Sequence, residues 1–202
     1  MNLHAKITLL FILCASAFIG TSQIDATVNP IGLLFGTFGV GGDIALSDNF
    51  STELGIGFGS RSFEDGLSGT YKYTNLSVEA TGKYYLNPDN GADKFYAGAF
   101  LRYINRGYSY DSPQTTFDID TNGQLVEVEY NGDYDQTRFG LGFLFGYKIV
   151  ANSNFVFDFN LGAGTSIADS FKYADSVGND ISIDWPGLMI VGKLGVGYRF
   201  GS

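Results

Sequence analysis

The chain has 202 residues, enough for one sizeable domain, and it is acidic: 21 Asp and Glu stand against 12 Lys and Arg, for a formal net charge of −9. This balance excludes nucleic acid as an expected partner, because phosphate backbones are bound by basic surfaces. Gly (28), Phe (18) and Tyr (13) are abundant, whereas Pro (4) is scarce.

Residues 1–22 have the pattern of a secretory signal peptide, with a basic residue, then a short apolar run, then small residues. We place the cleavage after Ser22, with a site after Ala17 as the alternative. Residues 23–202 then form the mature domain. No run of about 20 apolar residues follows, so no transmembrane helix is expected.

The only Cys and the only His of the chain, Cys14 and His4, lie in this leading segment. The mature domain therefore offers no disulfide, thiol nucleophile, histidine base or His-ligated metal. A carboxylate pair such as Glu53 and Glu79 is the remaining option for acid–base chemistry. These residues fall on a crowded strand face, so we expect no enzyme and predict no cofactor.

Alternation with period two runs through almost all of the mature sequence and predicts strands. Each segment puts apolar residues on one face and small or charged residues on the other. The segments are 52–63, 74–85, 138–149, 155–166 and 188–200, with 95–108 placing Phe100 and Ile104 on its polar face. Glycines such as those at 55, 57 and 59 lie inside strands. There they relieve crowding in a closed sheet rather than form a nucleotide loop.

Seven strands are clear when the segment ending at Leu46 is included, and barrels built from such strands normally have an even number. An eighth strand is available only at residues 24 to about 35, with a tight turn at 36–37. The alternative is one long bent strand over 30–46. We expect an all-β, up-and-down antiparallel transmembrane barrel of eight strands.

The connections between strands alternate in length. Short polar turns are predicted at 47–50, 87–93 and 151–154, and longer loops at 64–72, 109–135 and 169–181. Short turns at one end and long loops at the other are typical of an outer-membrane barrel, with the short turns on the periplasmic side.

Two classes of barrel fit these faces. A soluble lipocalin-like carrier buries its apolar face, whereas a membrane barrel turns that face to lipid and keeps charges inside. Strands of about 12 residues can cross a bilayer at a 45° tilt. Eight of the eleven Lys and Arg residues that remain without Lys6 fall on the glycine-bearing face. We therefore favour the membrane barrel, with the soluble carrier as the alternative.

Aromatic residues gather near the strand ends, as expected for two belts at the lipid headgroups. Near the short turns and the C-terminus are Tyr84, Phe95, Tyr147, Phe155, Tyr198 and Phe200. Near the long loops are Phe63, Tyr71, Tyr73, Tyr103, Phe171 and Trp185.

The charged residues of the glycine-bearing face are predicted to form an ion-pair network in the lumen. They are Asp43, Glu53, Arg61, Glu79, Lys83, Arg102, Arg106, Arg138, Lys148, Asp158, Lys193 and Arg199. An eight-stranded barrel has room for little beyond its own side chains, so we interpret the network as structural. Because its bases outnumber its acids by eight to four, a narrow anion-favouring channel is the alternative.

The C-terminal segment GKLGVGYRFGS is similar to the targeting strand of outer-membrane proteins, with outward residues ending in Tyr198 and Phe200. VNPIGLLFG, followed by DIALSDNFSTELGIGFGS, resembles the start of a family of small, mostly uncharacterised outer-membrane barrels, broadly like OmpA, OmpX and OmpW. The resemblance covers most of the mature chain. It implies a place in the outer membrane of a Gram-negative bacterium, contact with outer-membrane lipid and insertion by the barrel assembly machinery.

The segment FDIDTNGQLVEVEY (117–130) matches the spacing of an EF-hand calcium loop. The matching ligands are Asp118, Asp120, Asn122 and Glu129. An EF-hand needs a helix on each side, and Pro113 disfavours the entering helix. We therefore predict no metal site and treat a cation at these residues as the weaker alternative.

The Asn-Gly pair at 122–123 instead predicts a β-hairpin with a tight two-residue turn. Folding about this turn pairs Ile119 with Val126 and sets Asp118 opposite Glu127. Like charges directly opposed are unfavourable, so water, salt or a cation would have to screen this pair.

The outer loop 109–135, which contains the hairpin, carries seven acidic residues and no base. A solvated surface loop is the first interpretation, and a lid over an upper mouth formed by Arg61, Arg106 and Arg138 is the other. The leading hypothesis is a structural or surface-interaction role at the outer membrane, in which the acidic loop holds a surface ligand or cation.

Overall fold

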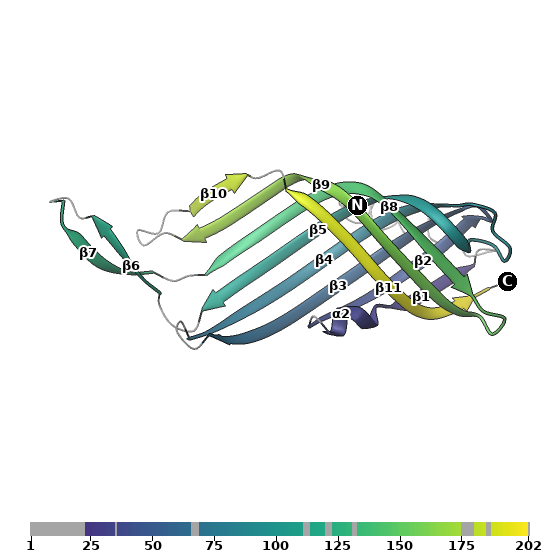
Figure 1. Cartoon of the computed structure of the whole chain (residues 1–202), viewed down its shortest axis with the longest axis horizontal. Helices are drawn as coiled ribbons and strands as arrows, with labels where there is room; N and C mark the ends of the chain where they lie inside the picture. The colour runs from purple at the N-terminus through teal and green to yellow at the C-terminus, as the bar shows by residue number, and fades with distance from the viewer. Residues whose placement is uncertain are drawn as a thin grey trace, which may run out of the picture.

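The computed structural model describes residues 23–34, 36–65, 69–110, 114–119, 123–130, 133–174, 180–184 and 187–201. Most of these residues belong to long, tilted strands that form one barrel (Figure 1). The predicted signal peptide and its cleavage site lie outside the described residues, so both stay predictions.

Eight strands close the barrel, and each is antiparallel to both of its neighbours. In ring order they are β1 (Ile24–Val28), β2 (Thr37–Ser47), β3 (Phe50–Asp65), β4 (Gly69–Tyr85), β5 (Lys94–Tyr110), β8 (Tyr134–Val150), β9 (Phe155–Ala174) and β11 (Leu188–Phe200). The last strand returns to the first, from the pair Ile24–Phe200 to the pair Val28–Val196, so that the sheet closes on itself. The predicted all-β barrel of eight strands is confirmed.

The predicted short turns are also confirmed. They join β2 to β3, β4 to β5, and β8 to β9. All three lie at the same end of the barrel as the C-terminus, on the right in Figure 1. By the usual arrangement of outer-membrane barrels, this end is periplasmic.

The chain between β1 and β2 corrects the predicted first strand. β1 ends at Val28, and a short helix follows, α2 (Pro30–Leu34). Asn29 caps it, because its side-chain oxygen accepts a hydrogen bond of 3.3 Å from the backbone N–H of Gly32. Pro30 suits the first helical position, where no backbone N–H is needed. The predicted strand from 24 to about 35 therefore ends early, at Val28, and the alternative strand over 30–46 is also wrong, because its first residues form α2 and β2 begins only at Thr37. Among the described residues, no helix is both long enough and apolar enough to span a bilayer.

Two of the predicted long loops are largely strand. β3 and β4 stay paired as far as Asp65 and Gly69, within the predicted loop at 64–72. β9 runs on through much of the predicted loop at 169–181, where β10 (Asp180–Asp184) pairs with it. Thr70 and Tyr71 in the first segment, and Phe171 and Tyr173 in the second, are residue types that favour a strand.

The outer rim of the barrel is uneven as a result. β3, β4, β5, β8 and β9 form what we call the tall wall, and β11, β1 and β2 form the low side. Thr37, at the top of β2, pairs with Gly59, six residues before the end of β3 at residue 65. Leu188, at the top of β11, pairs with Thr165, well before the end of β9. In Figure 1, α2 lies at the margin of the barrel, short of the outer ends of β3 and β4.

The two faces of the sheet have opposite chemistry. Phe143, on the outer face of β8, is 70% exposed, whereas its neighbour Leu144 is fully buried inside. Lys83 and Asp158 are also fully buried in the lumen. The soluble-carrier alternative is wrong, because such a carrier would bury Phe143 and turn its charges to water.

The apolar outer band ends at a definite level on the tall wall. Its last members are Phe58, Leu76, Tyr103 and Phe139, and the next outward positions are Ser60, Thr74, Asn105 and Thr137. We take this change from apolar to polar residues as the outer boundary of the lipid-covered surface. The tall wall above it stands in water.

The predicted aromatic belt at the periplasmic end is confirmed. Its members Tyr84, Phe95, Tyr147, Phe155, Tyr198 and Phe200 are between 41% and 54% exposed on the outer face. Tyr103 belongs to the outer belt, as predicted. The side chain of Phe171 and the whole of Trp185 fall outside the described part of the chain.

Three residues predicted for the outer belt, Phe63, Tyr71 and Tyr73, lie on the inner face instead. They alternate in phase with the lumenal residues Glu53 in β3 and Lys83 in β4. The prediction failed because it used closeness to the loops rather than strand phase. These rings line the mouth and do not meet lipid.

Inner-face glycines relieve crowding, as predicted, at positions such as Gly59, Gly142 and Gly146, but not at Gly55, where an added Cβ would meet no atom closer than 3.9 Å. A Cβ at Gly142 would lie 2.7 Å from Cε1 of Phe100, and one at Gly146 would collide with the ring of Tyr96. Phe100 and Ile104 are both buried on the inner face, where the sequence placed them.

Candidate functional site

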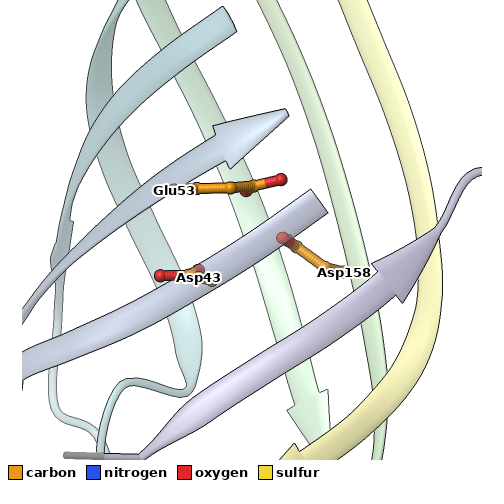
Figure 2. A group of neighbouring side chains, drawn as sticks. All are labelled: Asp43, Glu53 and Asp158. Carbon is orange, nitrogen blue, oxygen red and sulfur yellow. The ribbon is translucent and has the colours of Figure 1, made fainter. Parts of the chain in front are cut away.

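A buried ammonium group lies in the periplasmic half of the lumen. Lys83 Nζ is 2.8 Å from Asp43 Oδ2, 2.5 Å from Glu53 Oε2 and 2.8 Å from Asp158 Oδ2. Figure 2 shows these three carboxylates, from β2, β3 and β9, gathered inside the barrel. Together they surround a charge that water does not reach.

Strand register explains why these groups meet. Asp43 pairs with Glu53 between β2 and β3, and Lys148 pairs with Asp158 between β8 and β9. Lys83 lies on β4, next to β3, on the same inner face. In a barrel this narrow, inward side chains from opposite walls reach one another across the axis.

Further ion pairs continue toward the periplasmic end. Lys148 Nζ lies 2.6 Å from Asp43 Oδ2 and 2.8 Å from Asp25 Oδ2. Arg199 holds Asp25 at two points, with Nε 2.7 Å from Oδ1 and Nη2 2.9 Å from Oδ2. Lys193 bonds to Glu53.

The charges of this half of the lumen balance. The four cations are Lys83, Lys148, Lys193 and Arg199, and the four carboxylates are Asp25, Asp43, Glu53 and Asp158. Buried charges are tolerated when each is paired and hydrogen-bonded, and every group of this set has an oppositely charged partner, although Asp43 Oδ1 has no hydrogen-bond partner among the described residues.

Two tyrosines complete the set. The hydroxyl of Tyr96 donates a hydrogen bond of 2.6 Å to Asp158 Oδ1, and Lys83 Nζ lies 4.9 Å from the centre of the Tyr96 ring. Lys148 Nζ lies 5.3 Å from the centre of the Tyr85 ring. Both rings are fully buried. We call the eight charged residues together with Tyr85 and Tyr96 the lumen plug.

The carboxylates around Lys83 also have the spacing of metal ligands. One oxygen from each of Asp43, Glu53 and Asp158 lies within 4.8 Å of the others. Lys83 Nζ is bonded to all three, so the protein's own ammonium supplies the positive charge that a metal ion would bring. The arrangement is a salt-bridge centre.

A small polar cavity of about 100 Å³ lies above the plug. Its walls include Glu53, Lys193, Asn160, Glu79 and Arg102. Arg102 Nη1 lies 3.7 Å from Glu79 Oε2. A polar space of this size holds a few water molecules, which can satisfy the groups around it.

Higher still, the lumen opens into a mouth with a second hydrogen-bond network. Arg138 binds Asp169, with Nε 2.7 Å from Oδ2 and Nη2 2.6 Å from the same oxygen. Gln136 donates to the other oxygen of Asp169 at 2.9 Å and accepts from Arg106 Nη1 at 3.5 Å.

Positive charge is in excess at this mouth. Its described arginines are Arg61, Arg102, Arg106 and Arg138, and its described carboxylates are Glu79 and Asp169. Among the described residues, Arg61 and Arg106 have no carboxylate partner. Arg61 Nη2 donates instead to the backbone oxygen of Leu34 (3.1 Å), and the Arg61 guanidinium lies 5.6 Å from the Phe63 ring centre.

Aromatic rings line the inner face of the tall wall beside these arginines. Phe63 and Tyr71 stack with centres 5.0 Å apart. Tyr108 contacts Tyr73 at 4.9 Å and stacks on Tyr134 at 4.2 Å. Contacts of this kind across strands stabilise a sheet, and they hold the tall wall upright above the membrane.

Tyr73 stands beside Arg106 above the lipid-covered band. Burial raises the pKa of the Tyr73 phenol, and the Arg106 guanidinium opposes this rise only in part. The phenol is therefore neutral at physiological pH and keeps its hydrogen for donation.

The structure places all twelve predicted lumen residues on the inner face but divides them between two sites. Asp43, Glu53, Lys83, Lys148, Asp158, Lys193 and Arg199 belong to the plug, whereas Arg61, Glu79, Arg102, Arg106 and Arg138 lie above it. The sequence treated them as one network because strand phase gives the face of a residue and not its height.

Five residues of the two hydrogen-bonded networks escaped sequence reasoning, and one of them, Gln136, lies just before the predicted strand at 138–149. Asp25 lies in the short first strand, whose facing was not assigned, and Asp169 was placed in a loop that proves to be strand. Tyr85 and Tyr96 carried a usable signal, since Tyr85 alternates in phase with Lys83.

The acidic outer segment contains the predicted hairpin. β6 (Gln114–Ile119) and β7 (Leu125–Tyr130) form a separate two-stranded sheet, and β6 is a strand where an EF-hand would need a helix. The register is one residue away from the prediction: Ile119 pairs with Leu125, and Asp118 pairs with Val126 rather than facing Glu127. The tight turn at 122–123 is therefore wrong, since five residues separate the last paired positions.

The candidate cation ligands of the hairpin are outside what the structure describes. This applies to Asp120 and Asn122 entirely and to the side chains of Asp118 and Glu129, so the cation alternative stays untested. In Figure 1 the hairpin projects beyond the tall wall rather than across the mouth. The predicted lid over the arginines is not the arrangement of this structure.

A ring of strands without a break, an apolar outside and a charged inside define an outer-membrane β-barrel, since a sheet can cross a bilayer only when it closes on itself. The protein belongs to this class, and its place is the outer membrane. The model of the family described as "Protein of unknown function (DUF3575)" matches residues 7–185, and the chain belongs to this family. No curated protein matches the sequence.

Solved structures with a similar course of the chain include CarO of Acinetobacter baumannii, at 12% identity and a TM-score of 0.47 over 91% of this chain and 99% of that one. Another is Ail, the attachment invasion locus protein of Yersinia pestis, which was solved with the heparin analogue sucrose octasulfate. It shares 15% sequence identity with this chain at a TM-score of 0.42, and the match covers 89% of this chain and 94% of that one. A major outer membrane protein from Thermus thermophilus shares 17% sequence identity at a TM-score of 0.44, and the match covers 89% of this chain and 98% of that one.

Proposed function

We propose that the protein is a non-conducting outer-membrane barrel that acts at the cell surface. The lumen plug is the observation that carries this proposal, because ten side chains of balanced charge fill the periplasmic half of the lumen. Lys83, Tyr85, Tyr96 and Asp158 are fully buried within it. A solute could pass only by separating buried ion pairs, and a buried charge left without its partner costs about 3–5 kcal/mol.

The anion-channel alternative has less support. It was based on the excess of bases over acids on the inner face, and that excess lies at the wide outer mouth, with Arg61 and Arg106. The narrow part of the lumen is electrically balanced. A fixed positive charge there would be needed to favour anions.

We infer a binding role rather than a catalytic one. Glu53, one member of the conceivable acid–base pair, is held by Lys83 and Lys193, and Glu79 faces Arg102. The acidic hairpin is better placed to act, because it projects from the outer end and exposes Glu127 and Leu125. A basic protein surface or a cation is the partner chemistry that suits it.

Conductance in planar lipid bilayers tests this proposal. Folded barrel, verified by heat-modifiable gel mobility, should give a current indistinguishable from protein-free bilayers. A matched variant with the two plug rings removed, Tyr85→Ala/Tyr96→Ala, should leak. Discrete conductance steps from the wild-type barrel would overturn the proposal, whether or not the variant conducts more.

A further inference from the structure

The low side of the rim carries an apolar surface that rises above the strands. Three residues of α2 are well exposed: Ile31 (41%), Leu33 (58%) and Leu34 (73%). Directly below them, Val28 and Val40 continue the lipid-facing band on β1 and β2. Lipid chains that cover the band therefore also reach α2.

A cationic group is fixed at the edge of this apolar surface. Arg61, on the first strand of the tall wall, donates a hydrogen bond of 3.1 Å to the backbone oxygen of Leu34, at the end of α2. Gly36 makes this contact possible, because a Cβ there would lie 2.6 Å from Cγ of Arg61. Gly36 also has φ 70°, which a residue with a side chain rarely adopts.

The second unpaired arginine lies deeper in the mouth. Tyr73 is paired with Arg61 in the ladder and approaches Arg106 with its hydroxyl. The Nε atom of Arg106 is buried and has no hydrogen-bond partner among the described residues. Arg106 lies on β5, which in the ring order stands across from β1 of the low side, and its Nη1 donates to Gln136 on β8.

We propose that the low side of the mouth binds a lipid of the outer leaflet that carries a phosphate headgroup. The acyl chains lie against α2 and the outer band, and the phosphate enters over the low rim to Arg61 and Arg106. Guanidinium groups suit phosphate oxygens, and the neutral Tyr73 hydroxyl adds a donor. A phosphate supplies the negative charge that these two arginines lack in the described part of the protein.

Lipid titration followed by native mass spectrometry tests this site. Phosphatidic acid should bind the folded, detergent-solubilised barrel about tenfold more tightly than phosphatidylcholine of the same chain length. In Arg61→Gln/Arg106→Gln this preference should disappear. In Leu33→Ser/Leu34→Ser both lipids should bind more weakly, and free glycerol phosphate should not displace phosphatidic acid at equal concentration.

A matched control removes two positive charges elsewhere, in Lys72→Gln/Lys94→Gln. Lys72 lies on the outer face of the tall wall, and Lys94 pairs with Asp89 at the periplasmic end. The control should keep the full preference for phosphatidic acid. An equal loss in the control would show general charge attraction and overturn the site.

Two other results would also overturn the proposal. One is equal affinity of the wild-type barrel for the two lipids. The other is full competition by glycerol phosphate with no effect of the α2 variant, which would assign the arginines to a soluble anion. Heat-modifiable mobility of each variant confirms that it is folded.

The proposed lipid site depends on the barrel and its outer rim and not on the plug. A conducting barrel that binds phosphatidic acid would therefore contradict only the proposed function.

Discussion

Lys83 is the residue on which the interior depends most. It is fully buried and bonded to three carboxylates, which come from three different strands. Without it, three negative charges would share one buried space with no water to screen them. A single side chain thus joins walls of the barrel that are far apart in the sequence.

Replacing Lys83 by Met should lower the free energy of unfolding by at least about 3–5 kcal/mol, because it leaves buried carboxylates uncompensated. Urea unfolding in lipid vesicles measures this loss. Lys193→Met serves as the control, since the Lys193 side chain is 16% exposed and water can replace part of its role. A Lys83→Met barrel as stable as the control would contradict the account of the plug.

Gly146 should be intolerant of even one methyl group, because a Cβ there would collide with the ring of Tyr96. Gly146→Ala is expected to displace Tyr96 and weaken its hydrogen bond to Asp158, which lowers the folded fraction on heat-modifiable gels. Gly42→Ala is the matched control, with no atom within 4 Å of the added Cβ. Equal folded fractions for the two variants would contradict this packing.

The positions of the long strands could be predicted from the sequence, but the residues at which they end could not. Alternation fixed the face of each residue because successive side chains of a strand point to opposite sides. It could not show that β3 and β4 continue to Asp65 and Gly69, since polar outward residues there look like loop. The helix α2 was not predicted either, because five residues are too few to show a helical period.

The C-terminal strand has the features expected of a targeting strand. Tyr198 and Phe200 point outward, are 41% and 54% exposed, and contact each other with ring centres 5.1 Å apart. The same strand closes the barrel against β1. Its use by the barrel assembly machinery remains a prediction.

The β6–β7 hairpin should be dispensable for folding, because it forms a sheet of its own. Replacing residues 112–132 by a short Gly-Ser linker is expected to change the free energy of unfolding by no more than about 0.5 kcal/mol. Urea unfolding of the two proteins side by side checks this. A loss of several kcal/mol would show that the hairpin packs on the barrel after all.

At the scale of the whole molecule, each kind of side chain occupies its own region of the barrel. Apolar groups face outward, balanced charges fill the periplasmic half, and the surplus of positive charge sits at the outer mouth. The class of fold and the facing of its strands could be predicted from alternation and composition. The separation of plug from mouth could not, because the height of a residue depends on the stagger between strands.

A nitroxide scan over residues 139–149 of β8 tests the central claim most directly. Single cysteines can be placed in residues 23–202 without background, because the only Cys of the chain is Cys14. In lipid vesicles, oxygen collision rates should be high at the odd positions, including Phe143, and low at the even ones, including Leu144. The opposite phase, or strong exposure of the odd positions to a water-soluble relaxation agent, would contradict a barrel with its apolar face in lipid.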